Sequence, residues 1–154
     1  MTPATATATP PTTISVIEEQ SQSYTPRADV LQAPTDAPCL HDLGSALQAL
    51  ADLDDGWDSY GAVAPRRTAL SRAWTIASTL CELGIPPQVF PTRRGGVQLE
   101  WHTPAVSLEW EIDPSGGTGL FIFDNHATGE TYEGEVPSDV DRLGVALAQV
   151  YSSR

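Results

Sequence analysis

A change in the spacing of apolar residues near Gln88 constrains the fold of this chain more than any other feature. Before that point, leucines recur at intervals of three and four residues between Leu40 and Leu50, which predicts an amphipathic helix. After it, apolar side chains take every second position in 97–101 and 106–112. A period of two is typical of strands with one buried and one exposed face. The chain is therefore predicted to form helices first and an antiparallel sheet afterwards.

Two helices are predicted before the sheet and one after it. The first starts near Leu40, and the second runs from about Pro65 to Leu83, where Gly84 and two prolines end it. The apolar face of the second helix is predicted to comprise Leu70, Ala73, Trp74, Ala77, Leu80 and Cys81. Ser138 is expected to cap the last helix, with Asp141 three residues later. The apolar stripe of that helix is predicted to comprise Val140, Leu143, Leu147 and Val150.

Further strands follow from turn residues between apolar runs. QVFPT precedes the first alternating strand, and TGLFIFD and TYEGEV follow the second, separated by DPSGG and NHATGE. Because all these strands are consecutive, the predicted fold class is α+β, with a four- to five-stranded antiparallel meander. A single domain at 40–154 is expected.

Residues 1–38 have a different composition. They are rich in Thr, Pro and Ala, and the short ISVIEEQ run is the one apolar interruption. Too little apolar surface is available there to offset the entropy of ordering the chain, so a disordered tail is predicted. The ISVIEE run would suit addition to the sheet edge of a partner.

The charge of the chain is strongly acidic, with 20 Asp and Glu against 8 Arg, no Lys and a net charge of −12. This composition suggests a bacterial or phage protein of a GC-rich genome. An acidic surface repels phosphate backbones, so it disfavours direct nucleic-acid binding and favours a basic partner, or simply solubility. No apolar run approaches the ~18 residues of a membrane helix, and no signal peptide is visible, so no membrane association and a cytoplasmic location are predicted.

The two cysteines, Cys39 and Cys81, have no metal-binding spacing. A disulfide between them is possible, but two free thiols in a reducing cytosol are favoured. No cofactor or metal is predicted.

The stretch LADLDDGWDSYGAVAPRR, residues 50–67, allows two interpretations. Its aspartates suit Ca²⁺ or Mg²⁺, but with Gly56 at the glycine position of a calcium loop the expected ligand positions hold Ala51 and Leu53. A structural turn explains more: glycines supply backbone freedom, aromatic rings bury while their N–H and O–H bond loop carbonyls, and Asp58 accepts loop N–H groups. The turn residues are predicted to be Gly56, Trp57, Asp58, Tyr60 and Gly61.

GWDSYGA, the following helix, GIPPQVFPTRRGGVQLEW and LEWEI together resemble a group of small bacterial α+β proteins. These share a GWDxYGA turn and a GGVxLEW hairpin. The similarity spans roughly Leu47 to Glu135. The resemblance supports the fold boundaries and implies no activity, because that group carries none that is established.

The acidic side of the predicted sheet is the candidate site. A hairpin closed by HTPA would pair Trp101 with Val106 and place Glu109 diagonal to Glu100. The continuously apolar LFIF segment must turn one alternating pair away from the core; the hypothesis is that Phe121 and Phe123 lie on the open face beside carboxylates. The predicted partner-binding residues are Glu100, Glu109, Glu111, Phe121 and Phe123. Alternatives are a merely solvated face, or coverage of that face by a helix.

Sequence motifs of catalysis are missing: no GxSxG, HExxH, Walker loop or GxGxxG occurs, and His41, His102 and His126 are isolated in sequence. The prediction is therefore a non-enzymatic, acidic protein-binding module, inhibitor-like, antitoxin-like or an adaptor, for a basic partner such as one that handles nucleic acid. The alternative is a small hydrolase that uses acidic residues of the sheet face or of the Trp57 loop, with or without a divalent metal.

Overall fold

The structure is a computed structural model that describes residues 38–154. The predicted disordered tail and its ISVIEE run lie outside the described residues, except for Pro38, which belongs to a helix and not to a tail.

The described residues form three helices and one five-stranded sheet, and they confirm the predicted α+β class and antiparallel meander. The strands stand in chain order, so β1 and β5 are the two edges of the sheet. The elements are α1 (Pro38–Ala51), α2 (Arg67–Glu82), β1 (Gln88–Pro91), β2 (Val97–His102), β3 (Val106–Ile112), β4 (Thr118–Asn125), β5 (Glu130–Glu135) and α3 (Val140–Ser152).

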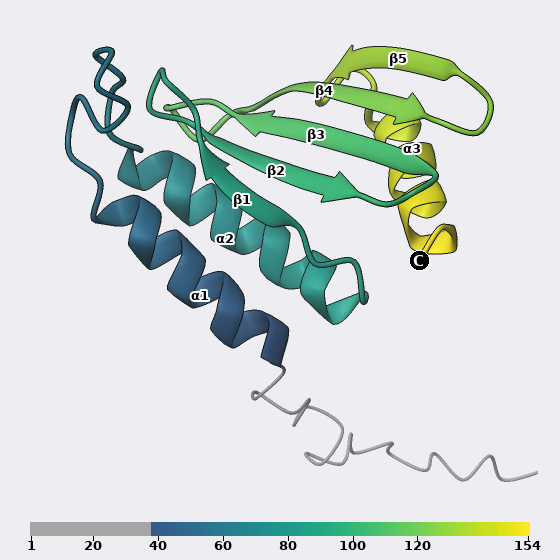
Figure 1. The fold of residues 1–154 in the computed structure, drawn as a ribbon, viewed down its shortest axis with the longest axis horizontal. Helices are drawn as coiled ribbons and strands as arrows, with labels where there is room; N and C mark the ends of the chain where they lie inside the picture. Colours follow the sequence, from purple (N-terminus) through teal and green to yellow (C-terminus); the bar gives the residue numbers. More distant parts are fainter. Residues whose placement is uncertain (1–37) are drawn as a thin grey trace, which may run out of the picture. The chain divides into compact units, whose positions relative to one another are not determined.

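All three helices pack on the same face of the sheet (Figure 1). Helices α1 and α2 lie side by side against β1, β2 and β3, and α3 packs against β3 and β5. The alternation of the strands produces this arrangement, because β2 and β3 bury every second residue. The other face is left without a helix among the described residues, so coverage of that face by a helix, one of the alternatives above, is not what the fold shows.

Three details of the helices differ from the predictions. Val140, predicted to lie on the apolar stripe of the last helix, is 54% exposed, and the buried residues of α3 are Leu143, Ala146 and Val150. Trp74 is 43% exposed, and its ring lies over Gly44 of α1. The buried stripe of α2 consists instead of Ala69, Ala73, Ala77, Leu80 and Cys81. Ser138 does not cap α3. The helix is preceded by Asp139, whose carboxylate accepts a hydrogen bond from the main-chain N–H of Glu135 at 3.0 Å.

The register of the β2–β3 hairpin also differs: Trp101 stands opposite Leu108, where the sequence had suggested Val106. The turn is tighter than expected. The main-chain N–H of Thr103 donates to the carbonyl of Val106 at 2.9 Å, and the Thr103 hydroxyl accepts from the N–H of Val106 at 3.0 Å. Only Pro104 and Ala105 therefore remain in the loop. The centre of the turn lies one residue later than expected, so every cross-strand pair moves by two positions.

Cys39 and Cys81 form a disulfide that joins the start of α1 to the end of α2. The prediction of two free thiols is therefore wrong. The spacing of 42 residues carried no sign of pairing, because connectivity depends on how the two helices pack. Among the helices of residues 38–154, none is both long enough and apolar enough to cross a membrane.

Candidate functional site

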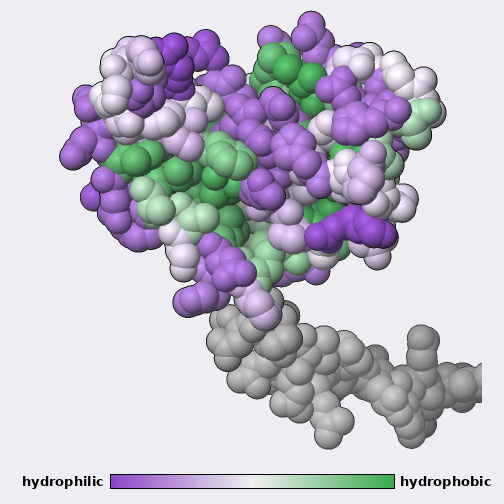
Figure 2. All heavy atoms as spheres, viewed as in Figure 1, coloured by the Kyte–Doolittle hydropathy of each residue, from purple (hydrophilic) through white to green (hydrophobic). Residues whose placement is uncertain are grey.

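The open face of the sheet, turned away from the helices, presents side chains of all five strands. Across its middle, consecutive cross-strand partners form one row: Gln88, Glu100, Glu109, Ile122 and Glu133. A second row, Phe90, Gln98 and Glu111, lies beside it, and on the other side lie His102, Ser107, Asp124 and Thr131. The surface over the central strands is mostly hydrophilic (Figure 2). We call these residues the open face.

Phe121 and Phe123 do not belong to the open face. Both are fully buried, whereas Leu120 of the same strand is 38% exposed, so the hypothesis placed the wrong pair outside. The rings pack on Tyr132 of β5, with centroids 6.3 Å from Phe121 and 4.9 Å from Phe123. A Cβ on Gly134 would stand 2.6 Å from the Phe121 ring, so this glycine makes room for the ring. Leu120 and Ile122 therefore point outward.

The predicted carboxylates do gather on the open face, and two of them face each other directly. Glu100 and Glu109 are cross-strand partners, an arrangement in which like charges repel and destabilise a sheet. Each finds a polar neighbour: His102 lies 2.9 Å from Glu100, and Gln98 donates to Glu109 at 2.8 Å. These contacts steady the side chains, but they leave the acidic character of the row in place.

Glu111 has a different environment, because it forms an ion pair with Arg94 at 2.9 Å. This partner comes from the turn between β1 and β2, and its side chain is largely exposed. The acidic surface is thus partly neutralised at one corner. Its strongest negative part is the middle row.

Phe90 is an aromatic residue of the open face that the sequence interpretation missed. It lies on β1 opposite Gln98 and is 41% exposed. The alternation in QVFPT carries the signal, since Val89 packs against the core and its neighbour must then point the other way. Phe90, Leu120 and Ile122 therefore supply the apolar contacts of this face.

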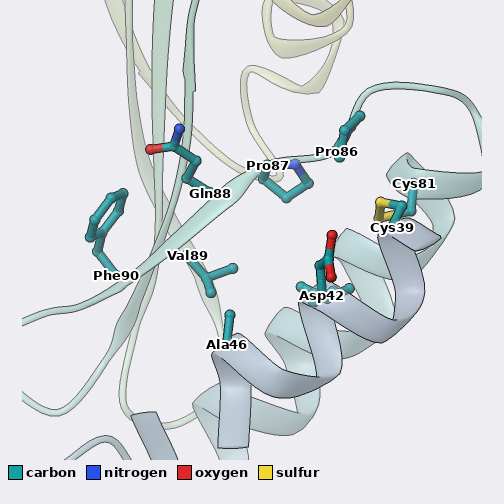
Figure 3. A pocket seen from close by; sticks show the side chains of 10 residues that line it. Cys39, Asp42, Ala46, Cys81, Pro86, Pro87, Gln88, Val89 and Phe90 are labelled. Atoms are coloured by element: carbon teal, nitrogen blue, oxygen red, sulfur yellow. A yellow bond between two sulfur atoms is a disulfide. The ribbon is translucent and has the colours of Figure 1, made fainter. Parts of the chain in front are cut away.

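A groove of about 560 Å³ runs between β1 and α1 (Figure 3). Its wall on the strand side includes Val89 and Phe90, and its wall on the helix side includes Asp42 and Ala46. The disulfide closes one end. Apart from the Asp42 carboxylate and the Gln88 amide, the side chains that line it are apolar or sulfur-containing. Phe90 lies both on the groove and on the open face.

The GWDSYGA loop contacts the RRGG turn, although the two are far apart in sequence. Arg93 Nε donates to Asp58 Oδ2 at 2.9 Å, and Arg93 Nη2 donates to the Tyr60 carbonyl at 3.2 Å. The main-chain N–H of Val63 donates to the Arg93 carbonyl at 2.9 Å. The two motifs that carry the resemblance therefore form one structural unit.

Asp58 accepts the loop hydrogen bonds that the sequence predicted. Its Oδ1 accepts from the main-chain N–H of Ala62 at 3.0 Å and of Tyr60 at 2.8 Å. The bond from Ala62 is the main cause that holds the pKa of Asp58 below its usual value, with Tyr60 and the Arg93 guanidinium acting in the same sense. The carboxylate is committed to the loop. It therefore has little capacity left to bind a metal or a substrate.

The aromatic residues of this loop differ from each other. Trp57 is half-buried and its Nε1 donates to the Val63 carbonyl at 3.3 Å, as expected. Tyr60 is 83% exposed, so the prediction that its ring is buried is wrong. Gly56 and Gly61 have φ of 83° and 88°, the left-handed region that the predicted turn required. No group of three or more His, Cys, Asp or Glu side chains in residues 38–154 is arranged to hold a metal ion.

Ser107 and His126 form a pair that sequence spacing did not suggest, with Oγ and Nε2 2.7 Å apart. A serine nucleophile needs a base, a third group that orients the base, and donors for an oxyanion. Asp124, the cross-strand partner of Ser107, instead accepts a hydrogen bond from Thr131 at 2.6 Å. The pair thus lacks this carboxylate as an orienting group and connects β3 to the turn after β4.

No protein-family model, curated protein or solved structure matches this chain.

Proposed function

We propose that this protein is an acidic protein-binding module, an inhibitor or adaptor, whose open face docks a basic surface of another protein. The observation that carries the proposal is the opposed pair Glu100 and Glu109 in the middle of a sheet face that no helix of residues 38–154 covers. Two carboxylates that repel each other are stabilised electrostatically when a cationic surface covers them.

Charge also selects among partners. With a net charge of −12, two copies of the chain would repel each other if their open faces met, and a nucleic acid would be repelled as well. A basic protein gains long-range attraction, which accelerates encounter. A partner whose own ligand is a phosphate group fits this description, because a row of carboxylates would occupy the same cationic groove.

Apolar contacts would supply the buried part of such an interface. Phe90 and Leu120 are exposed, and Ile122 lies between Glu109 and Glu133 in the middle row. Apolar side chains surrounded by charged ones form the usual centre and rim of a protein interface. These residues take the part that the sequence had given to the two buried phenylalanines.

Binding is preferred to hydrolysis because of how the loop carboxylates are used. Asp58 holds two loop N–H groups, and Asp55 accepts from the main-chain N–H of Ala64 at 2.8 Å. A hydrolase built on the Trp57 loop would have to release these carboxylates from the fold. The sheet carboxylates lie on an exposed surface, where water competes with any substrate.

A charge-matched capture experiment tests the proposal. The full chain is immobilised and exposed to a lysate of the organism that carries the gene, at low and at raised salt. The variant Glu109→Gln/Glu133→Gln removes two charges from the open face, and the control Asp54→Asn/Glu82→Gln removes two from exposed positions outside it. A specific basic partner should bind the wild type and the control, lose at least about tenfold affinity for the open-face variant, and weaken as salt rises.

An equal loss of affinity in the two double variants would mean that only the net charge matters, and it would contradict a specific docking face. Recovery of no protein that depends on Glu109 and Glu133 would overturn the binding function itself.

A further inference from the structure

The two edges of the sheet differ in how they are protected from further pairing. β5 carries three exposed carboxylates, Glu130, Glu133 and Glu135, and charges on an edge discourage another strand from pairing with it. β1, with the sequence QVFP, carries no charge. The edge at β1 is therefore the one that an additional strand would use.

The main-chain groups available at the β1 edge follow from the pairing with β2. The N–H of Thr92 donates to the Gly96 carbonyl at 3.1 Å, and hydrogen-bonded positions alternate along an antiparallel pair. Phe90 and Gln88 thus bond to β2, and the N–H and C=O of Val89 point outward. Pro87 and Pro91 flank Val89 and have no N–H. Within residues 38–154 no other strand pairs with this edge. It offers one N–H donor with carbonyl acceptors on both sides, which restricts an incoming strand to a short pairing in a single register.

The groove between β1 and α1 lies beside this edge. In Figure 3, Val89 points from β1 toward Ala46, and Asp42 extends from α1 into the same space. Phe90 borders the groove, but its ring extends to the other side of β1, toward the open face. A strand added here would direct every second side chain into the mostly apolar groove, and the others toward the acidic open face.

We propose that the β1 edge binds an extended segment of a partner protein in which apolar residues alternate with Arg or Lys. The inference rests on the proposed function, and it specifies how the basic partner is held. The apolar side chains enter the groove, the basic side chains lie beside Glu100 and Gln88, and the backbone pairs with Val89. Asp42 at the groove favours a cationic segment over an acidic one.

Two other occupants fit less well. A helix laid in the groove would leave the outward N–H and C=O of Val89 without strand partners, because its own main-chain groups are already paired. A second copy of this chain would bring its QVFP edge, which has no basic residue to place against the carboxylates. The alternating basic segment satisfies the backbone, the groove and the charge together.

The probe is a fluorescein-labelled peptide of about eight residues, alternating Val and Arg, long enough to cover the edge. Its affinity for the full chain is measured by fluorescence anisotropy. Alternating Val and Glu should bind at least about tenfold more weakly, because the charge is reversed. A peptide of four Val followed by four Arg keeps composition and charge, and it too should lose about tenfold if alternation matters.

A matched pair of variants locates the site. Ala46→Arg places a long cation in the groove, and Ala49→Arg places the same group on α1 outside the lining of the groove. The alternating peptide should lose about tenfold affinity for the first and keep its affinity for the second. Should Ala46→Arg lower the melting temperature strongly, Asp42→Arg at an exposed position of α1 replaces it, with the same expected loss.

Equal affinity of the chain for the alternating and the block peptides would overturn strand addition, and equal affinity of the two arginine variants would overturn the groove as its site. Absence of peptide binding to the wild-type chain would also overturn the proposal. So would an anisotropy change that occurs only when the chain dimerises, as measured by analytical ultracentrifugation. The proposed function and the β1-edge proposal can fail separately. If capture of the partner depends on Glu109 and Glu133 but not on Ala46, the open face is the interface and the β1 edge takes no part in it.

Discussion

In β4, one run of apolar residues contributes side chains to both faces of the sheet, and the two faces give these side chains different surroundings. In β4, Phe121 and Phe123 are enclosed by helices and Tyr132, while Leu120 and Ile122 of the same LFIF segment lie among carboxylates. Hydropathy does not separate these pairs. The difference arises from the neighbours: Gly134 leaves space for a ring on the covered face, and Glu109 and Glu133 flank Ile122 on the open one.

The largest expected effect comes from truncating the covered face. Phe121→Ala removes a fully buried ring and leaves a cavity, so the free energy of unfolding should fall by about 3–5 kcal/mol. Ile122→Ala, one residue away on the open face, should cost about 1 kcal/mol or less. Urea denaturation followed by tryptophan fluorescence measures both. Similar losses for the two variants would contradict the assignment of the faces.

The disulfide holds the helix layer of the covered face together. Cys39 and Cys81 are separated by 42 residues, and opening a loop of that length should lower the free energy of unfolding by roughly 2–4 kcal/mol, through the greater entropy of the unfolded chain. Denaturation with and without reductant measures this, and the double variant Cys39→Ser/Cys81→Ser should reproduce the reduced value. A count of two free thiols in the native, unreduced protein would contradict the bond.

Gly134 gives a smaller and more local test of the same packing. Gly134→Ala would place a methyl group against the Phe121 ring and Asp139, so a loss of about 1–3 kcal/mol is expected from overpacking. The matched control is Gly144→Ala in α3, where an added Cβ meets nothing and helix propensity should raise stability slightly. If Gly134→Ala were as stable as the wild type, the ring would not need the space that the glycine leaves.

Much of the fold followed from local patterns in the sequence. The period of apolar residues predicted the helices and strands, because each element buries one face and the period reports the geometry of that face. The consecutive order of the strands predicted the meander. The positions of Gly56 and Asp58 predicted a turn, and the loop bonds follow from their chemistry.

What the sequence could not supply depends on contacts between distant residues. The hairpin register was decided by the Thr103 hydroxyl, and the outward pair of β4 by a glycine one strand away. Arg93 binds Asp58 in the GWDSYGA loop, which is separated from it in sequence by helix α2. The candidate site depends most on such contacts. Its carboxylates were expected on one face of the sheet and lie there, but the identity of its apolar residues depended on which side of β4 faced the core.

The smallest expected effect is on the open face itself. Glu109→Gln keeps the shape of the side chain and its ability to accept from Gln98, but it removes the repulsion from Glu100. The free energy of unfolding should rise by about 0.2–1 kcal/mol at low salt, and this gain should shrink as salt screens the remaining charges. Urea denaturation at two salt concentrations measures the change, with Glu82→Gln at an exposed position of α2 as the control for net charge. The same Glu109→Gln substitution should weaken binding of the proposed basic partner, so stability and binding would change in opposite directions at one residue. A loss of stability would instead mean that the ionised Glu109 stabilises the folded state. The open face would then have no repulsion between carboxylates for a partner to relieve.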